Sequence, residues 1–297
     1  MFRNLNRRMQ NGAELSRQSW RALRENPHLL VFPLVSLIGS LLVSIVMFVP
    51  IAGSALFTTS TNRNGDPQVS ILTVVLLFIY YVLNYTVIIF SNTALIGAAA
   101  KIIRGEPATV RDGFDIAMSR IGKIIPYALL SATVGMVARA ITQSGRDKGL
   151  VGAILAAIIG SIIQGAWNII VFFAIPVLVY ENVGLIDSLK RSFELFKQTW
   201  GESFTGNTVI NAVGCLATLA IFVVFGGLIM LAIASGSTAF IVLSIALFIV
   251  AMIGLGLLSG AVNGVFQASM YQFAMTGDAG RYIDTNLARE AFTGGSR

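Results

Sequence analysis

Long apolar stretches without a charged residue dominate the chain. Five such windows contain no Asp, Glu, Lys or Arg, and they are residues 29–62, 68–100, 124–138, 149–180 and 203–277. A bilayer-spanning helix needs about 20 predominantly apolar residues. The third window reaches that length only when it is extended past Arg139 to Ile141, and the last, 75 residues long, holds two spans that meet at Ser235-Gly236-Ser237.

The pattern therefore predicts six spans, and these must be helices because open strands would leave backbone groups unpaired in lipid. They cover about 29–52, 70–103, 124–141, 150–180, 207–234 and 238–275. The predicted fold class is an all-α, polytopic membrane protein. Its predicted parts are a cytoplasmic basic amphipathic segment (1–28), a six-helix transmembrane domain (29–275) and a cytoplasmic tail (276–297). The long basic N-terminal region predicts a retained first span and not a cleaved signal peptide.

The distribution of Lys and Arg predicts the orientation. With six spans, 17 of the 21 basic residues fall on the side of the two termini and four fall on the other side. Because cytoplasmic loops carry the excess of Lys and Arg, both termini are expected in the cytoplasm of a prokaryotic plasma (inner) membrane. A three-span division of the last window would reduce the bias to 14 against seven.

Composition supports a membrane protein and excludes other classes. The chain is 55% hydrophobic and 12% charged, against about 25% charged in soluble domains, which excludes a soluble globular, a disordered or a disulfide-rich secreted protein. The net charge of +7 belongs to the loops, so no nucleic-acid partner is expected. With one cysteine, Cys215, and one histidine, His28, neither an internal disulfide nor a cysteine-based metal cluster is expected.

A basic amphipathic stretch precedes each pair of spans. The first, around Ser19-Trp20, aligns with the third, around Ser192-Phe193, and residues 115–121 are a weaker middle copy. Such helices lie in the headgroup layer with aromatic side chains in the membrane and cations toward anionic lipid. The alternative is that they only brace the bundle. The predicted lipid-interface residues are Trp20, Lys190, Arg191, Phe193, Phe196 and Trp200.

The resulting organisation would be three parallel repeats of interfacial helix, span and span. Asp112, Asp187 and Asp284 are predicted helix N-caps in the cytoplasmic connections.

Uncharged polar residues recur on single faces of the spans. The candidate intramembrane polar face consists of Tyr80, Asn84, Asn92, Gln164, Asn168, Asn263 and Gln267. These groups either bond helices to one another, at about 0.6–2 kcal/mol per hydrogen bond, or line a path for a small solute. Of the ionisable residues, Glu181 lies at an inner helix end and Arg139 near an outer end, where it can snorkel.

Two further features concern helix packing. Gly256, Gly260 and Gly264 form a small-residue ridge in the sixth span, which predicts close packing within the chain or, alternatively, in an oligomer. Pro176 is predicted to kink the fourth span.

The chain carries no recognisable catalytic constellation, nucleotide loop or metal motif, so neither an enzyme nor a cofactor is expected. Two functions remain, besides a membrane enzyme acting on lipid substrates, which is kept only as a remainder. The first is an accessory or structural subunit that packs with membrane proteins or with lipids, the latter expected to be anionic at the cytoplasmic face. The alternative is a passive channel or small-solute transporter that uses the amide faces. A homo-oligomer is compatible with either.

Four stretches carry a family resemblance. They are Ser19-Trp20 to Pro33, Ile121-Gly122 to Arg139, Pro176 to Gly206 and Tyr271 to Phe292. Through them the chain resembles a bacterial and archaeal family of uncharacterised six-span membrane proteins, and more distantly the membrane domain fused to some glycerophosphodiester phosphodiesterases. The resemblance implies the six-span fold and carries over no active-site residue.

Overall fold

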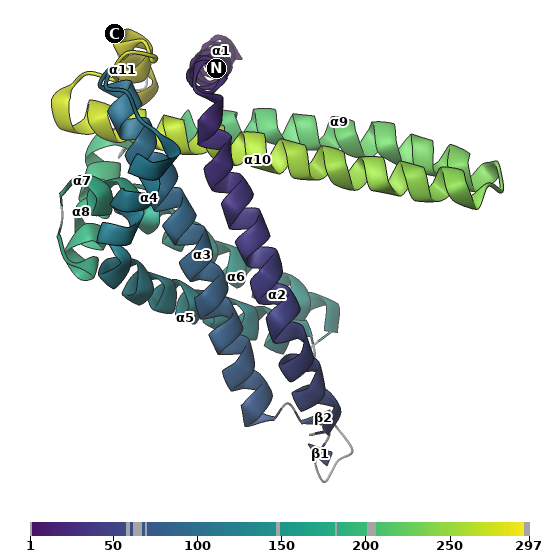
Figure 1. The fold of residues 1–297 in the computed structure, drawn as a ribbon. Coiled ribbons are helices and arrows are strands. Elements are labelled where there is room, and N and C mark those ends of the chain that lie inside the picture. Colours follow the sequence, from purple (N-terminus) through teal and green to yellow (C-terminus); the bar gives the residue numbers. More distant parts are fainter. Residues whose placement is uncertain are drawn as a thin grey trace. The chain divides into compact units, whose positions relative to one another are not determined.

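The computed structural model describes residues 2–57, 60–61, 67–68, 70–146, 149–181, 183–200 and 206–293. Its elements are, in order, α1 (Phe2–Glu25), η1 (Pro27–Leu30), α2 (Val31–Phe57), β1 (Ser60–Thr61), β2 (Pro67–Gln68), α3 (Ile71–Ile103), α4 (Val110–Ser119), α5 (Ile121–Arg146), α6 (Gly149–Val171), α7 (Ala174–Tyr180), α8 (Leu185–Trp200), α9 (Gly206–Ala234), α10 (Thr238–Thr276) and α11 (Thr285–Thr293) (Figure 1). The short strands β1 and β2 pair antiparallel.

Six stretches of described helix are long and apolar enough to cross a membrane. They are Pro27–Ser54, Ile71–Ile103, Ile121–Gly145, Gly149–Tyr180, Ala217–Ala234 and Thr238–Thr276. The all-α, six-span prediction is confirmed, and the protein is a multi-pass membrane protein. The predicted turn at Ser235–Ser237 is also confirmed, since Gly236 has φ +68° and Ser237 caps α10 by accepting a hydrogen bond from the Phe240 N–H.

The element order repeats three times as a helix outside the spans followed by two spanning helices. The helices outside the spans are α1 (24 residues), α4 (10 residues) and α8 (16 residues), and α4 occupies the place of the weakest predicted copy. Asp284 is the N-cap of α11 as predicted, since its carboxylate accepts from the Asn286 and Leu287 N–H groups. The assignment of Asp112 is wrong by one turn: Thr109 is the N-cap of α4, and Asp112 completes a capping box with it.

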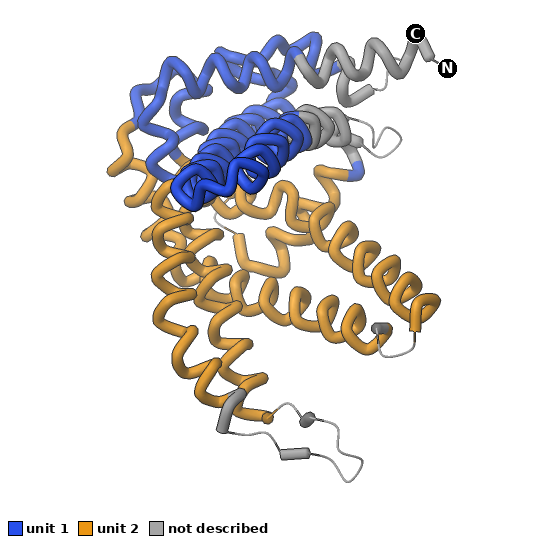
Figure 2. The backbone as a smooth tube through the Cα atoms, turned by 90° about the vertical axis from the view of Figure 1, so that its right-hand side faces the viewer, with its two compact units in different colours: residues 1–33, 98–108, 197–297 blue, residues 34–97, 109–196 orange. Residues whose placement is uncertain are grey.

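Two compact units make up the chain (Figure 2). Unit 1 contains residues 1–33, 98–108 and 197–297, and unit 2 contains residues 34–97 and 109–196.

In unit 2, α5 and α6 form a hairpin whose backbones approach closely at small residues. A methyl group on Gly145 would overlap the Cβ of Ala156 and would lie 2.6 Å from the carbonyl oxygen of Gly152. One on Gly160 would lie 2.5 Å from the Thr142 hydroxyl. Small residues permit such approach in membranes, where packing drives helix association.

The core of unit 2 lies where α3, α5 and α7 meet. Ile89, Ile124, Tyr127, Ala174 and Leu178 are among its buried residues.

The fourth span is broken and not merely kinked. The helix is interrupted at Phe172-Phe173, between α6 and α7, four residues before Pro176. A proline lacks an N–H, and its ring clashes with the carbonyl of the residue four positions earlier, which here is Phe172. The Phe173 N–H, freed by the break, donates instead to the Ser192 hydroxyl of α8 at 2.9 Å.

Replacing Ser192 with alanine should destabilise the protein by about 1–3 kcal/mol, because the buried N–H of Phe173 would lose its acceptor. Ser188→Ala is the matched control one turn earlier. Ser188 is also buried, but its hydroxyl donates only to the Leu185 carbonyl of its own helix. Unfolding by SDS in mixed micelles, followed by circular dichroism, measures both effects, and equal losses would contradict this role of Ser192.

In unit 1, α1 packs against α10 and α11. Its buried face consists of Leu15, Ser19, Ala22 and Leu23, which recur at the helical spacing. On α10 the residues from Ala261 to Tyr271 supply much of the buried surface.

The C-terminal segment is fixed within unit 1. The Tyr282 hydroxyl accepts a hydrogen bond from Asn26 at 3.2 Å. It also hydrogen-bonds to the Glu25 carboxylate, which together with Arg21 lowers the pKa of Glu25. Because a carboxyl with a lowered folded-state pKa stabilises the fold above its ordinary pKa of 4.5, this contribution is lost as the pH falls through the folded-state value.

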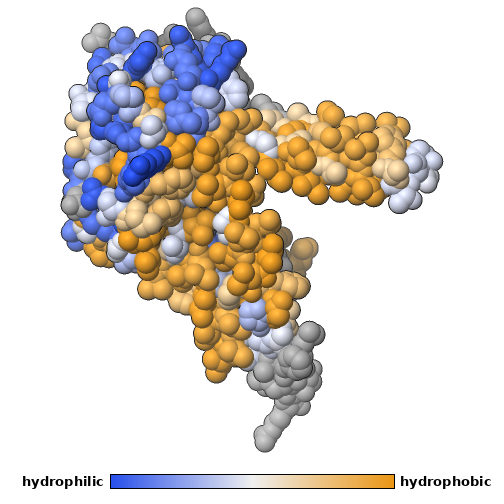
Figure 3. Space-filling view, in the orientation of Figure 1, coloured by the Kyte–Doolittle hydropathy of each residue, from blue (hydrophilic) through white to orange (hydrophobic). Residues whose placement is uncertain are grey.

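The α9–α10 hairpin presents apolar side chains on its exposed surface (Figure 3). The two helices pack through aromatic contacts, with the rings of Phe222 and Phe248 centred 5.3 Å apart. Outward-facing residues such as Val223, Met230 and Val250 are each about two-thirds exposed or more. Such a surface is suited to the lipid interior.

Candidate functional site

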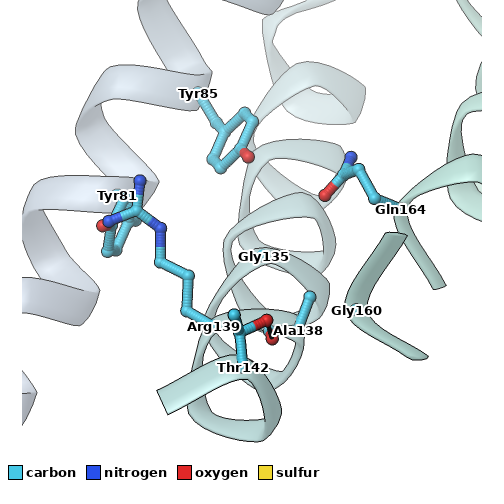
Figure 4. Close-up of a pocket in the computed structure, with 8 residues that line it drawn as sticks. All are labelled: Tyr81, Tyr85, Gly135, Ala138, Arg139, Thr142, Gly160 and Gln164. Carbon is cyan, nitrogen blue, oxygen red and sulfur yellow. Dashed lines mark hydrogen bonds between the residues drawn. The ribbon is translucent and has the colours of Figure 1, made fainter. Parts of the chain in front are cut away.

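A polar cavity lies within unit 2, between α3, α5 and α6. Its volume is about 270 Å³, and it is lined by Tyr81, Tyr85, Gly135, Ala138, Arg139, Thr142, Gly160 and Gln164. Figure 4 shows the Arg139 side chain extended toward the ring of Tyr81, with Tyr85 and Gln164 on other sides of the cavity.

The helices position these side chains by their spacing. Tyr81 and Tyr85 are four residues apart on α3 and therefore lie on one face. Gly135 on α5 accommodates the Tyr85 hydroxyl, since a methyl group there would lie 3.1 Å from it. The close approach of Gly160 to Thr142 draws α6 toward α5 and places Gln164, one turn later, at the cavity.

Arg139 is the charged group of the site. Its guanidinium carbon lies 5.0 Å from the centre of the Tyr81 ring, which is the geometry of a cation–π contact. It lies six residues before the end of the span at Gly145, which corresponds to about 9 Å along the helix. The guanidinium of Arg139 therefore places a positive charge at the cavity.

The neutral lining groups are hydrogen-bonding ones. The Thr142 hydroxyl donates to the Ala138 carbonyl at 2.8 Å, and the Gln164 amide donates to the Asn168 side chain at 3.2 Å. The residues that line the cavity include no carboxylate, histidine or cysteine. Among the described residues, no group of three or more metal-binding side chains gathers. The arrangement can therefore hold a polar or anionic group beside a fixed cation.

Comparison with known families matches residues 71–281, which is more than half of the chain, to a family of unknown function, DUF6159. The chain belongs to the DUF6159 family. This agrees with the coarser part of the resemblance, an uncharacterised membrane family, and it includes no link to glycerophosphodiester phosphodiesterases. A search of the curated proteins finds no match.

The polar residues predicted from the sequence are distributed over both units of this DUF6159 protein. Gln164 lines the cavity. Tyr80 hydrogen-bonds to Ser44 at 3.3 Å, Asn168 accepts from Gln164, and Asn84 and Asn92 are partly buried on α3. In unit 1, Asn263 is exposed and Gln267 is partly buried on α10.

Tyr81, Tyr85 and Thr142 line the cavity but are not among the polar residues predicted from the sequence. Arg139 was predicted to snorkel, whereas it lines the cavity. A usable signal was present in the sequence, because two tyrosines four residues apart share a helix face in one span while an arginine interrupts another.

The predicted lipid-interface residues divide into exposed and buried ones. Trp20 and Phe193 are 42% and 48% exposed, and Lys190 is exposed. Arg191 forms ion pairs with Glu181 at 3.3 Å and with Glu194 at 3.9 Å. The side chain of Trp200 lies outside the described residues.

The assignment of Phe196 to the lipid interface is wrong. Its side chain is only 8% exposed, and its ring packs against Phe172 at the helix break. Phe193 and Phe196, both predicted to contact lipid, lie on different faces of α8. Leu189 and Phe196 turn toward the protein, while Phe193 turns outward.

Only part of the glycine ridge of α10 packs against other residues. Gly264 is buried, Gly260 faces Pro33 at ordinary contact distance, and a methyl group on Gly256 would meet nothing within 4 Å. The tightest glycine contacts between two spans in the described chain are instead in the α5–α6 hairpin of this DUF6159 member.

Proposed function

We propose that the protein is a non-enzymatic accessory protein of the prokaryotic plasma membrane that binds anionic lipid at the cytoplasmic face. The observation that carries the proposal is the exposed face of α1. Arg17, Trp20, Arg21 and Arg24 are exposed at positions i, i+3, i+4 and i+7, opposite the face that packs inside unit 1. Such a face combines cations for headgroups with an aromatic side chain for the interface.

Helix α8 also presents basic and aromatic side chains on one exposed face. On α8, Ile186, Lys190 and Phe193 are exposed at the spacing i, i+4 and i+7, while Ser188, Ser192 and Leu195 are buried. Apolar and basic groups therefore share one outward face on this helix as well. The described α8 supports the proposal independently of α1.

The ion pairs on α1 leave its cations available to lipid. Arg17 pairs with Glu14 and Arg21 with Glu25, and both arginine side chains are more than 75% exposed. Exposed ion pairs contribute about 0–1 kcal/mol. Each basic residue near an anionic membrane surface contributes about 1 kcal/mol to attraction. Headgroups can therefore compete with these carboxylates.

The proposed orientation places α1 and α8 at the cytoplasmic side of the membrane. With both termini cytoplasmic, α1 and α8 face the leaflet side where Lys and Arg are concentrated in the sequence.

Brominated lipids test the proposal directly. In a full-length protein with Trp167→Phe and Trp200→Phe, Trp20 is the remaining tryptophan. In vesicles, brominated phosphatidylglycerol should quench it more strongly than brominated phosphatidylcholine at equal mole fraction. The preference should disappear in Arg21→Gln/Arg24→Gln and persist in Arg104→Gln/Arg111→Gln, a control with the same loss of charge at other exposed positions.

Equal quenching by the two lipids would refute the proposal. So would an equal loss of preference in both double variants, because net charge alone would then explain it. Solute flux through the reconstituted protein, above that of protein-free vesicles, would favour the passive channel or transporter instead.

A further inference from the structure

The cavity of unit 2 places a cation within a spanning helix. Among the described residues, no carboxylate lies within ion-pairing distance of Arg139. A charged side chain in a span costs several kcal/mol at the bilayer centre and less near the interface. The Tyr81 ring offsets about 0.5–2 kcal/mol of this cost. An anionic occupant would offset more, because it would pair directly with the guanidinium.

The neutral lining groups favour the same kind of occupant. The Tyr81 and Tyr85 hydroxyls and the Gln164 amide can all donate hydrogen bonds. Figure 4 shows the polar ends of Tyr85 and Gln164 directed toward the cavity that Arg139 borders. The lining contains no carboxylate that would repel an anion, whereas a cation would meet the charge of Arg139.

The cavity has a volume of about 270 Å³ and is open on the side where Arg139 and Gln164 are exposed. A tetrahedral phosphate group fits this space, with its substituent extending outside. Arginine is suited to this group, because its planar fork of donors matches phosphate oxygens bidentately.

We propose that this cavity is a binding site for a phosphate group. Arg139 pairs with the phosphate oxygens, the Tyr85 hydroxyl and the Gln164 amide donate hydrogen bonds to them, and Tyr81 orients the guanidinium from its other side. The phosphate belongs to a phospholipid headgroup or to free inorganic phosphate, which present the same chemistry to these residues. The site is independent of the exposed faces of α1 and α8 and stands if their lipid preference fails.

The test uses the full-length, delipidated protein in a neutral detergent. Two probes are titrated by calorimetry: inorganic phosphate, and dihexanoyl phosphatidylglycerol below its micellar concentration. Binding of inorganic phosphate identifies free phosphate as sufficient, and binding of only the short-chain lipid identifies the headgroup. Either result supports the site provided that the substitutions below weaken it.

Arg139→Gln is expected to weaken binding by about tenfold or more, since hydrogen bonds to charged groups contribute about 1.5–3 kcal/mol. Tyr85→Phe removes one hydroxyl and keeps the packing, so a loss of about three- to tenfold is expected, and this variant tests the site even if Arg139→Gln fails to fold. Lys123→Gln removes a positive charge elsewhere on α5 and should bind as the unmodified protein does.

The proposal is overturned if the unmodified protein binds neither probe. It is also overturned if Arg139→Gln and Tyr85→Phe both bind normally, or if Lys123→Gln weakens binding as much as Arg139→Gln does.

Discussion

Substituting alanine for Gly145 is expected to destabilise the α5–α6 hairpin by about 1–3 kcal/mol, and by more if the helices cannot separate. The added methyl group would overlap the Cβ of Ala156 and approach the Gly152 carbonyl oxygen to 2.6 Å. Both obstacles are attached to backbone, so a change of rotamer cannot relieve them. Because α5 and α6 also border the cavity, moving them apart should in addition weaken any ligand held by Arg139 and Gln164.

Gly165→Ala on α6 is the matched control. A methyl group there would meet nothing within 4 Å, and alanine favours helix over glycine by up to about 1 kcal/mol. The two variants should therefore change stability in opposite directions. Unfolding by SDS in mixed micelles measures the difference, and a Gly145→Ala protein as stable as the Gly165→Ala protein would contradict the close packing.

Substituting alanine for Gly280 should release the C-terminal segment from unit 1. Gly280 has φ +84°, in the left-handed region that costs an L-residue about 1–2 kcal/mol. Its added methyl group would also overlap the Ile103 side chain and lie 3.0 Å from the Ile103 carbonyl oxygen. That carbonyl accepts the Arg281 N–H at 3.1 Å, so the overlap would break this bond as well. A total loss of about 2–4 kcal/mol follows.

Gly277→Ala separates the two causes. Gly277 ends α10 with φ +76°, but a methyl group on it would meet nothing within 4 Å. Hydrogen–deuterium exchange over residues 279–289 should rise strongly for Gly280→Ala and slightly for Gly277→Ala. Equal exchange in the two variants would show that backbone conformation alone accounts for the effect.

The six spans could be predicted from the sequence because their information is local. The length of an uncharged window alone indicates whether it can span a bilayer. Ser235-Gly236-Ser237 interrupts the last window at the position where the structure turns. The helix N-caps were predicted only in part. Asp284 was placed correctly, whereas Thr109 and Asp112 share the capping of α4 and the residue type alone did not separate their positions.

Contacts between helices could not be predicted in the same way. Gly145 and Ala156 belong to different helices, and nothing in either stretch indicates that the two backbones meet there. The regular repeat of Gly256 and Gly260 predicted close helix packing, yet these two positions are largely open. Similarly, Phe196 and Phe193 are equally apolar, yet Phe196 packs against Phe172 at the helix break while Phe193 is exposed.

The cavity could not be predicted because its lining residues come from three helices. Tyr81, Arg139 and Gln164 lie far apart in the sequence, and each has an ordinary explanation as a residue of its own helix. Their meaning as a group appears only when α3, α5 and α6 are placed side by side within unit 2.

The α9–α10 hairpin has a consequence for how the protein enters the membrane. Residues 203–277 contain no Asp, Glu, Lys or Arg, and the turn at Ser235–Ser237 that joins the two helices contains only small side chains. Passing this turn across a bilayer would require no burial of a charge, so the pair can insert together as one unit. Since orientation follows basic residues near the span ends, only the residues that flank 203–277 can bias the orientation of this last pair, and the turn itself carries no charged anchor.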